Sequence, residues 1–179
     1  MEYRYLTAAE TAKLVRAALK TAYPTIKFSV KSKTYAGGAS IGITWIDGPT
    51  TKEVDAIVQP FGGADFDGMQ DLKTYNKHLL NGEPVRFGAD FIFTYRKPSP
   101  ALRAEALEIV KGWNPGRLPE YLTIEKVESL PCGAFGWDLM AFADAPTCDI
   151  ATAIHRASCE ISKTTRAALP QLPQLIGNN

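Results

Sequence analysis

The feature that most constrains the fold is a pair of alternating segments joined by a glycine turn. Residues 26–33 and 40–46 alternate between apolar and polar side chains, and Tyr35-Ala36-Gly37-Gly38 lies between them. The apolar positions are Phe28, Val30, Ile41, Ile43 and Trp45. A period of two with one apolar side predicts an antiparallel hairpin that buries one face and leaves the other polar.

A helix is predicted on each side of this hairpin. Thr7 with Glu10 and Thr50 with Glu53 both form a Thr-x-x-Glu capping box, a pattern typical of helix starts. The helical spacing of apolar residues after the first box predicts a helix over residues 8–22. The second box predicts a short helix that ends before Gly62-Gly63.

The rest of the chain gives weaker structural signals. Residues 61–82 are rich in Gly and Asp, and we expect a connection there that contains a short helix over 72–80 and places Phe61, Phe66 and Met69 in the core. Further elements are expected in the following order: strands over 84–87 and 90–96, a helix that starts at Ser99-Pro100, strands over 121–127 and 135–142, a helix over 149–167, and an extended tail.

This order predicts an α+β fold, with an antiparallel sheet and helices mainly on one face. Helix–strand–strand–helix occurs twice in the expected order, so two such units are one possible arrangement. At 179 residues we expect a single domain over 1–179. Its parts are a helix–hairpin–helix half over 1–82, a second α+β half over 83–168 and a tail over 169–179.

Charge and cysteine usage limit the class of protein. The chain has 20 Lys and Arg against 19 Asp and Glu, so electrostatic binding requires a local patch. No apolar run reaches the ~20 residues of a membrane helix, and the first residues lack the pattern of a secretory signal. Cys132, Cys148 and Cys159 form no disulfide framework, so we expect free thiols and a cytoplasmic protein without membrane contact. The oligomeric state stays open.

The polar face of the hairpin is the leading candidate for a binding site. Its lysines recur at even spacing, close to the spacing of successive phosphates, and its turn glycines allow a ligand to approach the backbone. A phosphate-bearing ligand or an acidic partner surface would fit there. The alternative is a solvated sheet face whose edge lysines prevent aggregation. The candidate residues are Lys27, Lys31, Lys33, Tyr35, Gly37, Gly38, Ser40 and Thr44.

Two other candidates are weaker. Asp65, Asp67 and Asp71 superficially resemble a calcium loop, but the third ligand position is wrong and Asn76 occupies the twelfth, so a structured turn or a recognition surface is expected. Cys132 lies in a Pro-Cys-Gly turn where a nucleophile would need His78 or His155 as its base. The chain carries no hydrolase, metalloprotease or nucleotide-loop motif, which favours a non-catalytic protein without metal or cofactor.

Four segments together are similar to a known family. Residues 5–10, 28–41, 45–49 and 66–69 carry the similarity, and it covers about residues 5–76. The chain resembles the twenty-ninth of the large-polyvalent-protein-associated domains, which occur in phages, plasmids and conjugative elements. The resemblance implies a mobile-element setting and a role against host defences, but it brings no catalytic residues and no identified target.

Three functions follow from the setting and the candidate site. The first is an anti-defence protein that binds a host immune component. The second is a nucleic-acid-binding accessory protein that uses the lysine hairpin, and the third is a sponge for a nucleotide immune signal. The near-neutral net charge favours the first over the second, because dedicated DNA-binding proteins usually carry a basic excess. The expected partner is therefore a host defence protein, or its nucleic-acid or nucleotide ligand.

Overall fold

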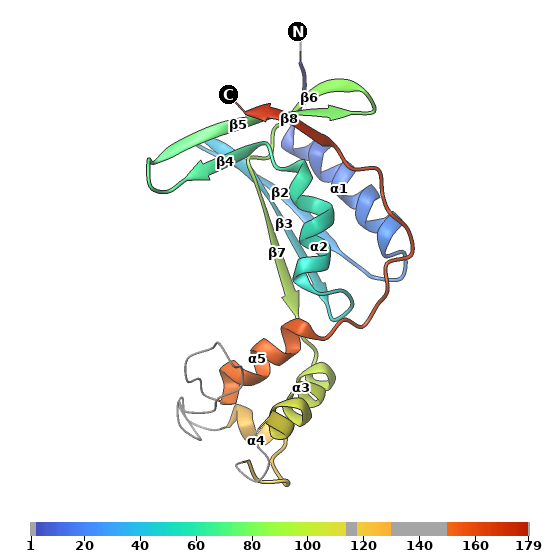
Figure 1. Cartoon of the computed structure of the whole chain (residues 1–179), viewed down its shortest axis with the longest axis vertical. Coiled ribbons are helices and arrows are strands. Elements are labelled where there is room, and N and C mark those ends of the chain that lie inside the picture. Colours follow the sequence, from blue (N-terminus) through green and yellow to red (C-terminus); the bar gives the residue numbers. More distant parts are fainter. Residues whose placement is uncertain (1–2, 114–117, 130–149, 179) are drawn as a thin grey trace. The chain divides into compact units, whose positions relative to one another are not determined.

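The computed structural model describes residues 3–113, 118–129 and 150–178, and their helices and strands are mixed along the chain (Figure 1). Contacts divide the chain into two compact units. The first comprises Met1–Arg96 and Thr164–Asn179, and the second comprises Lys97–Lys163. Each unit has its own cluster of buried apolar residues. The α+β class is confirmed, whereas the single domain expected from the sequence stays a prediction.

The first unit begins with the predicted helix–strand–strand–helix segment. Its elements are α1 (Ala8–Ala22), β2 (Ser29–Tyr35), β3 (Gly38–Ile46) and α2 (Thr51–Val58), followed by a 3-10 turn over Gln59–Phe61. Both capping boxes are confirmed: Thr7 and Thr50 each accept from the third backbone N–H of the helix, and Glu10 and Glu53 each accept from the cap N–H. β2 and β3 pair antiparallel, as predicted.

A third strand, β7 (Phe91–Lys97), pairs with β3 on the side away from β2. The backbone N–H of Asp90 donates to the carbonyl of Ala39 at 2.8 Å, next to the start of both strands. At the other end, Arg96 Nε donates to the carbonyl of Asp47 at 3.0 Å. β3 and β7 therefore run in the same direction. The long segment between them permits this, because a parallel pair needs a crossover connection.

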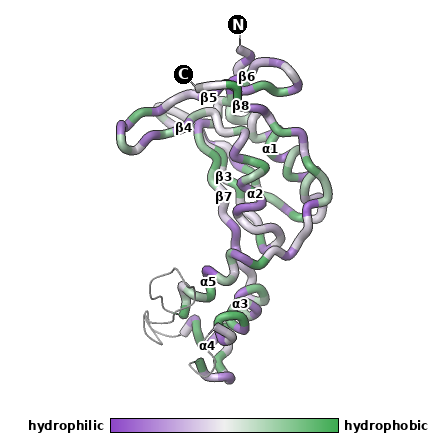
Figure 2. The backbone as a smooth tube through the Cα atoms, viewed as in Figure 1, coloured by the Kyte–Doolittle hydropathy of each residue, from purple (hydrophilic) through white to green (hydrophobic). Residues whose placement is uncertain are grey.

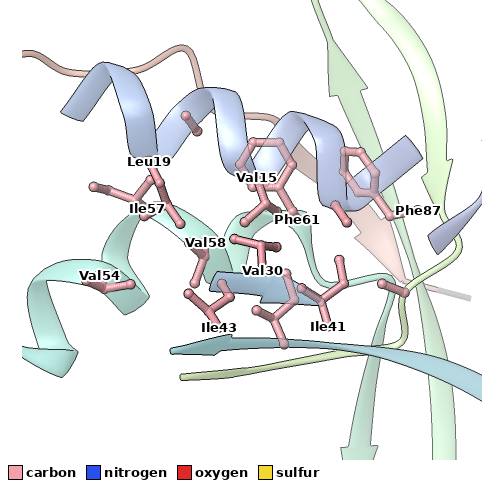
Figure 3. Packing of buried hydrophobic residues seen from close by; sticks show 14 of the residues in the cluster. Val15, Leu19, Val30, Ile41, Ile43, Val54, Ile57, Val58, Phe61 and Phe87 are labelled. Carbon is pink, nitrogen blue, oxygen red and sulfur yellow. The ribbon is translucent and has the colours of Figure 1, made fainter. Parts of the chain in front are cut away.

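Helices α1 and α2 cover one face of this three-stranded sheet (Figure 3). Val15 and Leu19 of α1 and Ile41 and Ile43 of β3 belong to one core cluster, and all four are fully buried. Hydrophobic and hydrophilic residues follow one another along α1, as expected for a helix with one buried side (Figure 2). Val54, Ile57 and Val58 of α2 complete this core. Neither helix covers the opposite face of this sheet (Figure 3).

A second sheet lies in the same unit. Its strands are β1 (Arg4–Leu6), β6 (Glu83–Phe87), β5 (Leu72–Leu80) and β4 (Ala64–Asp67) in that order, and β8 (Gln174–Asn178) also pairs with β5. The β1–β6 pair is parallel and the other pairs are antiparallel. The two segments that make up the first unit are thus joined through the pairing of β8 with β5.

The expected short helix over residues 72–80 is wrong, because this segment is strand β5. Asn76 and His78 are buried at a spacing of two, and the strand pairs with β4, β6 and β8. The expected core positions are right for Phe61, which is buried, and wrong for two others. Phe66 is 55% exposed and Met69 is 96% exposed, because they belong to a projecting β4–β5 hairpin rather than to a packed turn.

The second unit contains helices α3 (Pro100–Trp113), α4 (Ile124–Glu128) and α5 (Ile150–Glu160). Ser99 caps α3 as predicted, accepting from the N–H of Leu102. The strand expected over 121–127 is wrong: Ile124 and Val127 are buried one helical turn apart in α4. The strand expected over 135–142 lies outside the described residues. α5 is shorter than the expected helix over 149–167.

No helix in the described part of the chain is both long enough and apolar enough to cross a membrane.

Candidate functional site

The strand register brings most of the predicted site residues onto one surface. Lys33 lies opposite Ser40, and Ser29 lies opposite Thr44. Residues that are directly opposite in an antiparallel pair share a face, and Lys31 and Lys33 are both exposed on it. Lys27 is also exposed but precedes β2, so it lies beyond the paired strands.

Strand β7 adds aromatic side chains to this surface. Ile92 is buried, and Thr94 donates through its hydroxyl to Asp55 of α2 at 2.8 Å, so these two residues face the helices. The alternate residues Phe93 and Tyr95 face the opposite side and are 47% and 56% exposed. We call this surface the outer sheet face and define it by Lys31, Lys33, Ser40, Thr44, Phe93 and Tyr95.

The sequence indicates that these aromatic residues share one face of a strand, but it does not indicate whether that face is buried or exposed. A strand was predicted over residues 90–96, and in β7 the alternate residues Phe91, Phe93 and Tyr95 lie on one face. The alternation does not say which face is covered. Only the position of α2 decides that Ile92 is buried and that the aromatic residues are not.

The charge of the chain is divided unevenly between the two units. The first unit contains 13 Lys and Arg and 10 Asp and Glu, and the second contains 7 and 9. Their net charges are therefore +3 and −2, which sum to the +1 of the whole chain. The sequences of β2, β3 and β7 contain no Asp or Glu. The outer sheet face thus carries only positive charge from its own strands.

A cavity of about 700 Å³ lies at the tip of the β2–β3 hairpin. The predicted residues Tyr35, Gly37 and Gly38 line it, together with Tyr75 and Asn76 of β5 and Arg86 of β6. The cavity therefore lies between the hairpin tip and the second sheet. Sequence reasoning missed its second wall, because residues 72–80 were expected to form a helix.

Two residues that line the cavity each carry a buried polar atom without a hydrogen-bond partner among the described residues. The two atoms are the Oδ1 atom of Asn76, whose side chain belongs to a residue only 6% exposed, and the Nε atom of Arg86. The Nδ2 atom of Asn76 lies 3.5 Å from the carbonyl of Gly62, to which it donates, and this orients the amide. Buried polar groups are normally hydrogen-bonded, so these two atoms are exceptions. β5 and β6 pair His78 with Val85, so the side chains of Asn76 and Arg86 lie on opposite faces of the second sheet.

Asp90 ties the hairpin tip to β5. Its Oδ2 atom accepts from the N–H of Ala39 at 3.0 Å and lies 2.7 Å from Lys73 Nζ. The Lys73 ammonium also donates to the carbonyl of Gly37 at 3.2 Å. Burial alone would lower the pKa of Lys73, but the hydrogen bond and the charge of Asp90 outweigh it and raise that pKa. The Lys73–Asp90 pair therefore holds one side of the cavity in place.

The Asp-rich segment forms strand β4 and the turn that leads into β5. Asp67 Oδ1 accepts from the N–H of Met69 at 2.8 Å, and Asp71 has a φ of 51°. Asp65 and Asp67 lie in β4, opposite Thr74 and Leu72 of β5. Within the described ranges, no group of three or more His, Cys, Asp or Glu is arranged to hold a metal ion. The recognition role of this turn stays a prediction.

The two histidines expected as possible bases belong to different units. His78 is 2% exposed, packs against Phe87 and has its pKa lowered by burial, which the charge of Asp65 opposes in part. His155 lies on α5 in the second unit, 3.8 Å from the sulfur of Cys159, which is a free thiol. Cys132 and Cys148 lie outside the described residues, so the proposed Cys132 nucleophile is not tested.

Comparison with known proteins identifies one family. No curated protein and no solved structure matches the chain. The sequence model of large polyvalent protein associated domain 29 matches residues 6–99, from the last residue of β1 to Ser99, which caps α3, and this confirms and extends the resemblance. These domains are associated with polyvalent proteins of phages and mobile elements. Since the match covers more than half of the chain, including β2–β7, the protein belongs to the family of large polyvalent protein associated domain 29.

Proposed function

We propose that this protein is a non-catalytic accessory protein of a phage or other mobile element that binds single-stranded nucleic acid on its outer sheet face. The observation that carries the proposal is the exposure of Phe93 and Tyr95 on the same face as Lys31 and Lys33. Aromatic side chains beside a basic groove are the usual components of a surface that binds single strands.

The geometry of the face fits such a ligand. Lys31 and Lys33 lie two residues apart on one strand, a spacing of about 6–7 Å that approaches the spacing of phosphates along a strand. Ser40 and Thr44 are small residues on the central strand, and Gly42 lies between them. Bases can reach Phe93 and Tyr95 across this low surface only when they are unstacked, which favours a single strand over a duplex.

The near-neutral net charge of the whole chain argued against nucleic-acid binding. That argument does not apply to the first unit taken alone. The unit that carries the outer sheet face has a net charge of +3. Attraction to a polyanion depends on the local field, and the whole-chain net charge also counts the acidic residues of the second unit. Nucleic acid is therefore the better supported of the expected partners.

A host immune protein is the second candidate partner, and binding to it would make this chain an anti-defence protein. Ile46 of β3 is 65% exposed, and it adds to the apolar surface of Phe93 and Tyr95. Exposed apolar groups that gather on one face are typical of protein interfaces. The two candidates differ in salt dependence, because counterion release accompanies the binding of nucleic acid.

The test is fluorescence anisotropy with a labelled oligothymidine of about 12 nucleotides and a duplex of the same length. We expect the wild-type chain to bind the single strand more tightly than the duplex. Charge reversal by K27E, K31E and K33E together should abolish binding, with an unchanged circular dichroism spectrum. The matched control is K13E with K20E, which reverses two exposed lysines of α1 and should have little effect.

Full binding by the triple variant would refute this function. If the wild-type protein binds neither oligonucleotide, the host immune protein becomes the favoured partner. That candidate is then tested by capture from a bacterial lysate, with bound proteins, nucleic acid and small nucleotides analysed together and the triple variant as the control.

A further inference from the structure

The β4–β5 hairpin projects from the second sheet (Figure 1) and ends in an exposed apolar group. Phe66, Met69 and Leu72 are 55%, 96% and 53% exposed. Single exposed apolar side chains are common on protein surfaces, but several at the end of one hairpin are typical of an interaction site. We call these three residues, together with Asp65, Asp67 and Asp71, the β4–β5 tip.

The β4–β5 tip is presented by a closed turn. β4 and β5 pair as far as Asp67 and Leu72, which lie opposite each other. Within the turn, Asp67 Oδ1 accepts from the backbone N–H of Met69 at 2.8 Å. A partner therefore meets an apolar side chain on a backbone that is already folded, which lowers the entropic cost of binding.

The charge of the β4–β5 tip restricts the chemistry of its partner. Residues 64–72 contain Asp65, Asp67 and Asp71 but no Lys or Arg. A nucleic acid or an anionic membrane would repel this tip, whereas a surface that combines lysines with apolar side chains would attract it. The first unit of this chain contains such a surface, which is the outer sheet face.

The outer sheet face carries its charge and its apolar surface in two separate rows. Lys31 and Lys33 lie on β2, and the exposed Phe93 and Tyr95 lie on β7. The central strand β3 lies between these rows and contributes small residues to the face. A ligand that has one acidic side and one apolar side can therefore contact both rows at once.

The β4–β5 hairpin has two such sides. Asp65 lies opposite Thr74, Phe66 opposite Lys73, and Asp67 opposite Leu72. Because successive side chains of a strand point to opposite faces, Asp65 and Asp67 lie on one face of the hairpin and Phe66 lies on the other. The acidic face can meet the lysine row of the outer sheet face while Phe66 meets its aromatic row.

We propose that the β4–β5 tip of one copy of this chain docks on the outer sheet face of a second copy. Each copy donates one tip and accepts one, so the contact joins two different surfaces of the same chain. The docked tip occupies the face that we assign to nucleic acid, so self-association and strand binding exclude each other. The self-association itself does not depend on nucleic-acid binding.

The first test is sedimentation velocity of the full chain at low salt. One hairpin tip buries a small area, so the association is weak and the concentration should span about 5–500 μM. We expect the weight-average sedimentation coefficient of the wild-type chain to rise with concentration. F66S with M69S should weaken the association at least about 10-fold, because both side chains lose their apolar contacts. A wild-type chain that stays monomeric throughout this range overturns the proposal.

The matched control is I109S with Y121S. Ile109 and Tyr121 are exposed apolar residues of the second unit, at 40% and 71%, and lie outside both proposed surfaces. This variant should associate like the wild-type chain. Equal losses in the control and in F66S with M69S would overturn the assignment of the contact to the β4–β5 tip.

The second test is an exchange of charges between the two surfaces. D65K with D67K makes the tip positive, and K31E with K33E makes the face negative, so each variant alone should lose self-association. An equimolar mixture of the two should associate again, and so should one chain that carries all four changes. Circular dichroism checks that each variant is folded. Variants that are folded but do not associate in either combination overturn the proposal.

The oligothymidine separates this inference from the proposed function. F66S with M69S should still bind the strand, because these residues are not on the outer sheet face, and added strand should dissociate the wild-type assembly. A wild-type chain that associates but binds no strand contradicts the proposed function and leaves the docking of the tip supported. An assembly that binds the strand without dissociating overturns the docking on this face.

Discussion

Lys73 and Asp90 form a largely buried ion pair, with Nζ 2.7 Å from Oδ2, that joins β5 to the residue before β7. Their side chains are 24% and 8% exposed. The same carboxylate accepts from the N–H of Ala39, so one residue contacts the hairpin tip and the second sheet at once. The shape of the cavity depends on this pair, because Gly37 and Gly38 lie against it.

Replacement of Asp90 by alanine should destabilise the protein strongly. D90A removes the acceptor of the Ala39 N–H and leaves the Lys73 ammonium without its carboxylate, for which we expect a loss of about 3–5 kcal/mol in the free energy of unfolding. Urea denaturation measures this change. The control is E83A, which breaks the exposed Arg4–Glu83 pair and should cost less than about 1 kcal/mol. Similar losses in both variants would contradict the role of Asp90.

Gly63 should not tolerate a side chain. G63A places a Cβ atom 2.1 Å from the backbone oxygen of Phe87, which cannot move away as a flexible side chain can. We expect a loss of about 1–3 kcal/mol and a lower melting temperature, measured by thermal unfolding. Gly42 is the matched control, because a Cβ atom added there would have nothing within 4 Å, and G42A should be neutral or slightly stabilising. Equal effects of the two changes would contradict this explanation.

The aromatic residues and the lysines of the outer sheet face should contribute differently to nucleic-acid binding. F93A and Y95A should each weaken oligothymidine binding by about 1–3 kcal/mol, the usual loss of a stacked base, and should leave the salt dependence unchanged. K31E or K33E should reduce the slope of log K against log salt by about 0.7 for each lost phosphate contact. Anisotropy titrations between low and moderate salt separate the two effects. A change of slope in F93A would count against stacking.

His78 should make the stability of the protein sensitive to mild acid. Burial lowers its pKa in the folded state, so the unfolded chain binds more protons near pH 6. Stability is therefore retained above the ordinary histidine pKa and lost as the pH falls through that value, by at most about 1.4 kcal/mol per pH unit for one proton. Urea unfolding at pH 7.5 and 5.5 measures the difference.

The variant H78Q should flatten this dependence, whereas H155Q should retain it. These are the two histidines of the chain, and His155 is exposed on α5. A wild-type slope in H78Q would assign the acid sensitivity to other groups.

Elements whose signals are local could be predicted from the amino-acid sequence. The capping boxes at Thr7 and Thr50 involve residues three positions apart, and the alternation in β2 and β3 involves residues two positions apart. These contacts form within one helix turn or one hairpin, so neighbouring residues specify them without the rest of the chain. The predicted hairpin residues Lys33 and Ser40 share a face for the same reason.

Features that depend on contacts between distant residues could not be predicted from local sequence. Residues 72–80 form a strand because β4, β6 and β8 offer backbone partners to β5, and the local pattern there was compatible with a helix. Phe93 is exposed because α2 covers the opposite side of β7. Tyr35 and Tyr75 line one cavity only because the second sheet lies beside the hairpin tip. Local sequence cannot specify which face is covered or which strands become neighbours, because burial and strand pairing are long-range contacts.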